Sequence, residues 1–408
     1  MRGAATAVAA PSLMAFLEAC SKKSTGGGGG AAGPAPTATF SVASPEHPVT
    51  WPIYNDNKPI ASGLTPENGA TINVYTYTDY LDPAALKSFE KKYKAYNLKV
   101  TITTFEDTTE ALGKIRTGGV QADIYNPSYD QIGKMVTAKL LAPLNHSYIP
   151  NIANVWPSYT NPFYDQQWQY TTPYLLYGTG IAWRTDLVSE DIATLTNPYD
   201  ILWDPKYAKK LSVLDDYRTC MGMVLLRNKL DINTTKAEDL ALVHKQLTEM
   251  NQTTMPKVNV TDYTDLPTKI VDLCQAWAGD AVNMLSYMPA GQSPDVLRYW
   301  GPAGTNAAVD NDLLVMLKET KAPVATHLFL NHMMDYEVAI SNFSFTGYQP
   351  PQNQITPDKL VSDGFVPATM SSAVVRQTDY QQGQHILELP PDADAAWQAV
   401  WQQFKAGS

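Results

Sequence analysis

The sequence predicts an α/β protein in which strands and helices alternate along the chain. Between residues 71 and 141, strand-like and helix-like segments follow each other in turn, an order typical of a parallel sheet covered by helices. The chain has 408 residues, enough for two hydrophobic cores. Hydrophobic residues make up 44% of the chain and charged residues 17%, which is the composition of a folded globular protein.

The first strand and the first helix have clear local signals. Residues 72–78 (INVYTYT) alternate with a period of two, as a strand does. Asp82 and Pro83 supply an N-cap and a first-turn proline for the helix that follows. Three apolar residues then recur at helical spacing: Leu86, Phe89 and Tyr93.

The next two strand and helix pairs follow the same rule. Residues 98–105 (LKVTITTF) form the second predicted strand, and 110–117 form a short helix that ends at a glycine pair. Residues 122–125 form the third strand. Pro127 begins a helix that we expect to run to about Leu141.

Polar and aromatic side chains follow the ends of two predicted strands, at 77–80 and at 126–130. In parallel sheets, ligands bind beyond the carboxyl ends of the strands. These two segments are therefore expected to form the rim of a binding site.

The first 20 residues indicate an export signal. Arg2 precedes an Ala-rich apolar stretch, which Pro11 interrupts and which is too short to span a bilayer. Cys20 directly follows a small residue, which resembles the lipobox of bacterial lipoproteins and implies acylation of this cysteine. Residues 21–47 then form a flexible tether. The alternative is an ordinary signal or a disordered tail in which Cys20 is incidental.

Charge and motif content exclude several function classes. The net charge of −10 argues against a nucleic-acid partner, which needs a basic face. No cofactor and no metal are expected, because the cysteines and histidines are scattered. The sequence contains no Walker loop, GxSxG elbow or HExxH motif, so we do not expect an enzyme. Cys220 and Cys274 either form a disulfide or remain two buried thiols.

Five segments carry a family likeness: TYTDYLDPAALKSFEKKY (76–93), LWDPKYAKKLSVLDDYRTC (202–220), DLCQAWAGD (272–280), NAAVDNDLLVML (306–317) and FTGYQPPQ (345–352). They resemble the spermidine- and putrescine-binding receptors of ABC importers, and WAGD with the downstream Asp312 and the DDYR segment are specific in combination. The similarity extends over about 48–407, nearly the whole mature chain.

This resemblance implies the two-lobed fold of type II periplasmic binding proteins, with a hinge of crossover strands. The first crossing is expected near Thr172 and the return near 310–315. Lobe 1 is then expected to consist of 48–172 and 312–350. Lobe 2 is expected to consist of 173–311 and 351–408, and the second of these ranges includes a C-terminal packing segment.

The resemblance also implies a ligand site between the lobes. In such receptors carboxylates bind the ammonium groups through charge-assisted hydrogen bonds, and aromatic rings enclose the methylene chain. Carried over by motif, the expected ligand contacts are Tyr77, Thr78, Tyr80, Ser128, Asp216, Trp277, Asp280, Asp312 and Tyr348. Structural roles are the alternatives: Trp277 as a core residue, Asp216 as the partner of Arg218, and the other two acids as helix caps or surface residues.

Three positions differ from the family pattern. Thr219 replaces a glutamate that binds one end of spermidine, Asp130 stands where an aromatic residue is expected, and Asp310 replaces a second tryptophan. The site would keep its carboxylates but redistribute them.

The expected function is that of a monomeric extracytoplasmic receptor that delivers a polyamine to the permease subunits of an ABC importer. A lipid anchor would hold it in the periplasm or on the outer face of the cytoplasmic membrane. The alternatives are a receptor for another solute, such as a sugar or an amino-acid-type cation, an extracytoplasmic hydrolase with paired carboxylates, and a surface interaction protein.

Overall fold

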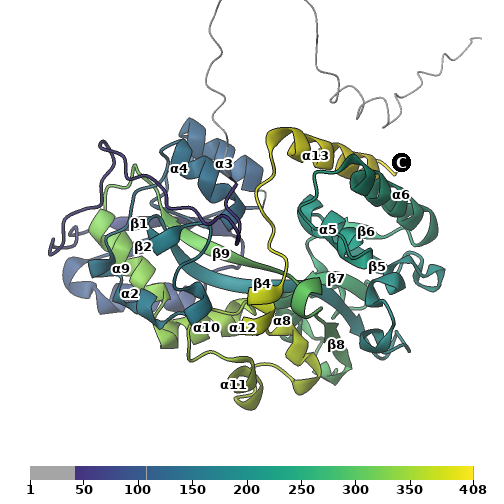
Figure 1. Ribbon diagram of the computed structural model, residues 1–408. Coiled ribbons are helices and arrows are strands. Elements are labelled where there is room, and N and C mark those ends of the chain that lie inside the picture. Colours follow the sequence, from purple (N-terminus) through teal and green to yellow (C-terminus); the bar gives the residue numbers. More distant parts are fainter. Residues whose placement is uncertain (1–41, 107, 408) are drawn as a thin grey trace, which may run out of the picture.

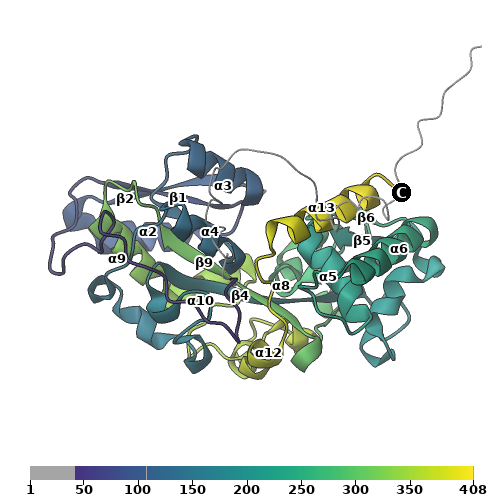
Figure 2. The ribbon, with the colours of Figure 1, turned by 45° about the horizontal axis from the view of Figure 1, so that its top comes forward.

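The computed structural model describes residues 42–106 and 108–407, which form two α/β lobes side by side (Figures 1 and 2). One nine-stranded sheet extends through both lobes in the order β2-β1-β3-β9-β4-β7-β5-β6, and β8 pairs with β4. The predicted α/β fold class is confirmed. The strands are β1 (Thr71–Tyr77), β2 (Lys99–Phe105), β3 (Ile124–Tyr125), β4 (Thr171–Arg184), β5 (Leu211–Leu214), β6 (Lys257–Asn259), β7 (Leu273–Trp277), β8 (Leu297–Trp300) and β9 (Ala308–Met316).

The first lobe begins with the predicted parallel strands, since β1 pairs in parallel with both β2 and β3. The helix α2 (Pro83–Lys92) starts where the sequence predicts, because the Asp82 carboxylate accepts a hydrogen bond of 2.8 Å from the N–H of Ala84. The helix α3 (Thr108–Thr117) ends before Gly118, whose φ of +72° is a conformation that glycine adopts without strain.

The helix expected to extend to Leu141 is shorter than predicted. After a single 3₁₀ turn, α4 covers only Ile132–Thr137, and Lys139 has a left-handed φ of +55°. The reason is tertiary: the N–H of Lys318 donates to the carbonyl of Leu140, so the backbone here pairs with the segment that follows β9. These long-range hydrogen bonds replace those of another helical turn.

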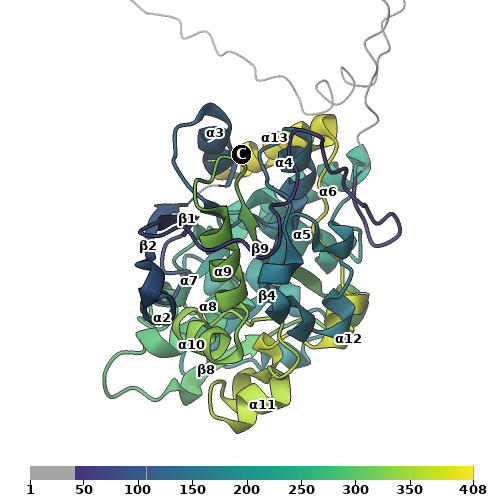
Figure 3. The same cartoon turned by 90° about the vertical axis from the view of Figure 1, so that its left-hand side faces the viewer.

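Two long antiparallel strands connect the lobes. The first part of β4 pairs with β9, and its last part pairs with β7 and β8 of the second lobe. Figure 3, a view onto the first lobe, shows α9 (Pro323–Met333) and α10 (Tyr336–Thr346) in front of these strands. The expected crossings near Thr172 and 310–315 lie within β4 and β9. The residue limits of the two lobes stay a prediction.

The C-terminal segment crosses back from the first lobe to the second (Figure 1). Its last helix, α13 (Pro391–Lys405), packs on α5 (Tyr217–Arg227) and α6 (Ala237–Thr253) of the second lobe. Trp397 and Trp401 of α13 are buried in the core of this lobe, which fixes the helix by apolar contact. The remaining α-helices are α7 (Asp262–Asp265), α8 (Ala278–Asn283), α11 (Pro357–Ser362) and α12 (Gln377–Gln382).

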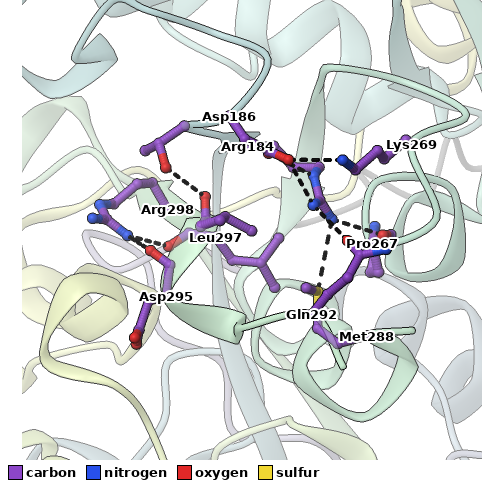
Figure 4. Close-up of polar contacts among 11 residues, drawn as sticks. Arg184, Asp186, Pro267, Lys269, Met288, Gln292, Asp295, Leu297 and Arg298 are labelled. Carbon is purple, nitrogen blue, oxygen red and sulfur yellow. Dashed lines mark hydrogen bonds and ion pairs between the residues drawn. The ribbon is translucent and has the colours of Figure 1, made fainter. Parts of the chain in front are cut away.

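A buried arginine at the end of β4 orders the loops of the second lobe (Figure 4). The Arg184 side chain is 1% exposed. Its Nη1 donates to the carbonyl of Pro267 at 2.7 Å, and its Nη2 donates to Oε1 of Gln292 at 2.9 Å. Its Nε donates to the Asp186 carboxylate at 2.9 Å. Because Pro267 follows α7 closely, these bonds fix that helix relative to the sheet.

The two cysteines of the folded region are free. Cys220 lies in α5 and Cys274 in β7, and both are buried, so the disulfide alternative is wrong. Burial raises the pKa of both thiols.

None of the helices within 42–106 and 108–407 combines the length and the apolar character that a membrane span requires. In the same ranges, no group of three His, Cys, Asp or Glu side chains is arranged to hold a metal ion.

Candidate ligand-binding site

Tyrosine rings gather where β1 ends next to the crossover strands. Tyr80 makes edge contacts with the rings of Tyr77 at 5.3 Å and Tyr348 at 4.9 Å between centroids. β4 contributes two further rings, one on Tyr80 at 6.0 Å and one on Tyr348 at 5.6 Å. We call this group the tyrosine cluster: Tyr77, Tyr80, Tyr174, Tyr177 and Tyr348. Three of its members are predicted ligand contacts, and the other two lie outside the predicted set.

Asp312 projects from β9 toward this cluster. The hydroxyl of Tyr80 donates to its Oδ2 at 2.5 Å, and Asp312 is 4% exposed. Burial raises the pKa of Asp312 to about 7, although the Tyr80 hydrogen bond favours the charged form. A carboxylate accepts up to about four hydrogen bonds, so this one has capacity for a cationic donor. Two predicted ligand contacts, one acidic and one aromatic, therefore lie together in the fold.

Asp280 lies against the same cluster from the second lobe. It follows β7 within α8, and the Tyr348 hydroxyl donates to its Oδ1 at 2.9 Å. Gly279 permits this contact, because a Cβ at this position would lie 2.2 Å from the Tyr348 ring. Burial raises the pKa of Asp280 to about 7. Trp277, three residues earlier, is half-buried. It packs against the hydrophobic core that contains Tyr80 and Tyr348, so its contacts extend beyond the second lobe.

A second set of acids, Asp310 and Glu388, interacts electrostatically with Asp130. Ser128 Oγ donates to Asp130 Oδ1 at 2.5 Å, and the backbone of Ser128 bridges to that of Asp312. Burial raises the pKa of Asp310 and of Glu388, and the negative charge of Asp130 raises both further. The pKa of Glu388 reaches about 7 although Lys134 lies 3.4 Å away. Burial of Asp310 and Glu388 near the negative charge of Asp130 favours the presence of a cation.

Two predicted ligand contacts, Asp216 and Thr78, are not members of the tyrosine cluster. Asp216 is the N-cap of α5, where its Oδ1 accepts a 2.7 Å hydrogen bond from the N–H of Thr219. Arg218 donates instead to the carbonyl of Leu387 at 2.7 Å, and no ion pair joins it to Asp216 in the described part of the chain. Burial raises the pKa of Asp216. Thr78 is exposed at the end of β1.

Besides Tyr177 of the tyrosine cluster, three acidic or aromatic neighbours of the site lie outside the predicted set. Tyr174 donates its hydroxyl to the carbonyl of Tyr80 at 2.5 Å and so fixes the chain at that ring. Glu388 comes from the C-terminal segment, and Asp262 contacts Asp280 from α7. None of them belongs to a motif, and an irregularity of β4 between Pro173 and Leu175 interrupts the strand alternation that could have placed Tyr174.

A model of the family of bacterial extracellular solute-binding proteins matches residues 84–365 of this chain. The spermidine/putrescine-binding periplasmic protein 1 of Haemophilus influenzae is 24% identical over 372 residues, which are 91% of this chain and 97% of that protein. The spermidine/putrescine-binding periplasmic protein of Salmonella typhimurium is 25% identical over 343 residues, 83% of this chain and 92% of that protein.

Among solved structures, the spermidine/putrescine ABC transporter substrate-binding protein of Streptococcus pneumoniae superposes with a TM-score of 0.65 and 23% sequence identity. The superposition covers 83% of this chain and 99% of that chain, so the two share the whole two-lobed fold. The region matched by the family model is more than half of the chain and includes Asp280, Asp312 and Tyr348. The chain therefore belongs to the family of bacterial extracellular solute-binding proteins.

Proposed function

We propose that this protein is an extracytoplasmic receptor that binds a polyamine and delivers it to the permease of an ABC importer. One observation carries the proposal: two buried carboxylates, Asp312 and Asp280, each accept a hydrogen bond from a tyrosine, and those two tyrosine rings contact each other. A polyamine carries at least two ammonium groups joined by an apolar chain. Acids separated by aromatic rings match this pattern.

The chemistry of the site favours an organic cation over an uncharged solute. A desolvated ammonium group needs a carboxylate partner, and charge-assisted hydrogen bonds are the strong kind. Each aromatic face adds about 0.5–2 kcal/mol of cation–π attraction. The names of the relatives from Haemophilus influenzae and Salmonella typhimurium agree with this ligand class.

A second candidate is an amino-acid-type cation, which carries a carboxylate as well as an amine. Arg218 is its specific support. This side chain is 7% exposed, and its Nε has no hydrogen-bond partner among the residues that the structure describes. Burial raises the pKa of Asp216 and of Asp310, and the positive charge of Arg218 offsets part of that rise. A fixed positive charge of this kind suits a ligand with an anionic end.

Calorimetric titration with a small panel of ligands tests the ligand class. We expect spermidine or putrescine to bind, because either supplies ammonium groups for the buried acids, and an uncharged sugar to produce no binding heat. An amino acid with a terminal amine is the third ligand. If the sugar or the amino acid binds and both polyamines do not, the polyamine proposal is wrong. Chromatography of the recovered ligand checks that it is unchanged, as a receptor without catalysis requires.

We also propose that the protein is a monomer anchored to the outer face of the membrane through Cys20, which lies outside the described residues. We expect Cys20→Ser to move the protein from the membrane fraction to the soluble fraction, because the serine cannot carry the thioether-linked lipid. Cys220→Ser is the matched control, since Cys220 is a buried thiol of α5. Identical fractionation with and without Cys20 contradicts the anchor.

A further inference from the structure

Asp262 is a buried acid with an unusual neighbour. It lies in α7, is 1% exposed, and neither of its carboxylate oxygens has a hydrogen-bond donor among the described residues. The helix α7 packs against α8, and there the carboxyl group of Asp262 interacts with that of Asp280. Two ionised carboxylates in contact repel each other, and burial away from water makes the repulsion costly.

No lysine or arginine of the described residues forms an ion pair with either acid, so nothing in direct contact offsets this repulsion. The side chains that interact electrostatically with the pair come from four elements or loops: Asp265 and Tyr263 in α7, Cys274 in β7, Tyr299 in β8 and Tyr348 in the loop after α10. Asp265 has its own donor, since Asn259 Nδ2 lies 3.0 Å from its Oδ2.

A shared proton resolves the conflict in the ligand-free protein. A protonated carboxyl group is a donor, so one proton between the two groups gives Asp262 the hydrogen bond that it otherwise lacks. Burial and the neighbouring charge raise the pKa of Asp262, and burial raises the pKa of Asp280 to about 7. Such a pair titrates as a unit, as two close carboxyl groups do in general.

We propose that Asp262 and Asp280 share one proton in the ligand-free receptor and release it when an ammonium group of the ligand binds to Asp280. This inference rests on the proposed function, because it requires a cationic ligand at that acid. Charge and protons balance in this exchange. The pair of carboxyl groups changes from one negative charge to two, the ammonium group keeps its own protons, and the displaced proton passes to the buffer. Polyamine binding is thereby coupled to pH.

The direction of the pH effect follows from this exchange. Below neutral pH the pair keeps its proton, and the proton competes with the ammonium group, so affinity falls. Above neutral pH the pair has already lost the proton in the ligand-free receptor. The affinity for the ligand is therefore higher, and fewer protons are released on binding. For each proton released, affinity is expected to rise by up to about tenfold per pH unit.

The experiment is calorimetric titration of spermidine at pH 7 in buffers with different heats of ionisation, since the slope of binding heat against ionisation heat counts the protons released. Asp262→Asn is the test variant, because the asparagine amide donates a hydrogen bond to Asp280 and removes the need for the proton. We expect the variant to release about 0.5–1 proton fewer than the wild type and to show a weaker pH dependence of affinity.

Asp295→Asn is the matched control, since Asp295 is an exposed acid of the same lobe and is expected to leave proton release unchanged. Equal release by the wild type and Asp262→Asn overturns the shared proton while leaving the polyamine receptor intact. Absence of spermidine binding to the wild type overturns the proposed function and this inference with it. If the variant does not fold, infrared spectroscopy of the wild type decides: a protonated-carboxyl band that spermidine leaves unchanged overturns the inference.

Discussion

Replacing Asp312 with asparagine is expected to weaken spermidine binding by about 1.5–3 kcal/mol, or about 10- to 150-fold. The carboxylate is almost fully buried beside Tyr80, and the amide that replaces it has no negative charge for an ammonium group. Calorimetry at pH 8 is the measurement, because burial raises the pKa of Asp312 to about 7 and the wild type is mostly ionised above it. At pH 6 the wild type is itself largely protonated, so the difference between the two proteins shrinks.

Two further variants make this test specific. Asp358→Asn changes an exposed acid of α11 and is expected to bind spermidine like the wild type. Tyr80→Phe keeps the ring but removes the hydroxyl donor, so the pKa of Asp312 rises and binding at pH 7 weakens less than in Asp312→Asn. If Asp312→Asn binds spermidine at pH 8 as tightly as the wild type does, Asp312 is not a ligand contact.

The local elements of the first lobe were predictable because their signals are local. The cap by Asp82 and the glycine after α3 depend on residues within one turn of the helix end. The end of α4 was not predictable in this way. It depends on a backbone hydrogen bond between Leu140 and Lys318, which are far apart in the sequence. Propensity alone carries no information about such a partner.

The site shows the same division between local signal and long-range placement. Tyr80 and Asp312 are 232 residues apart, and no periodicity in the chain indicates that they meet. Their prediction came from the likeness of whole segments to known receptors. Asp262 lies in the short run Asp-Tyr-Thr-Asp, which resembles an exposed turn, and only the packing of α7 against α8 buries it beside Asp280.

The largest effect on stability is expected at Arg184, which lies outside the ligand site. Arg184→Met is predicted to lower the free energy of unfolding by about 2–4 kcal/mol. The buried carbonyl of Pro267 loses its donor, and Asp186 loses a two-bond partner at 2.9 and 3.1 Å. Methionine fills much of the apolar volume of the arginine stem but donates no hydrogen bond. Urea unfolding followed by circular dichroism measures the change.

Arg298→Met is the matched control, because Figure 4 shows this second arginine in the same region with a different set of partners. Arg298 is half-exposed and donates to the carbonyls of Asp295 and Leu297, both within three residues along the chain. Water replaces those bonds when the side chain is shortened, so the loss is expected to stay below about 1 kcal/mol. The contrast isolates burial as the cause, since both variants remove a guanidinium group. If Arg184→Met unfolds at the same urea concentration as Arg298→Met, the buried hydrogen bonds of Arg184 do not stabilise the second lobe.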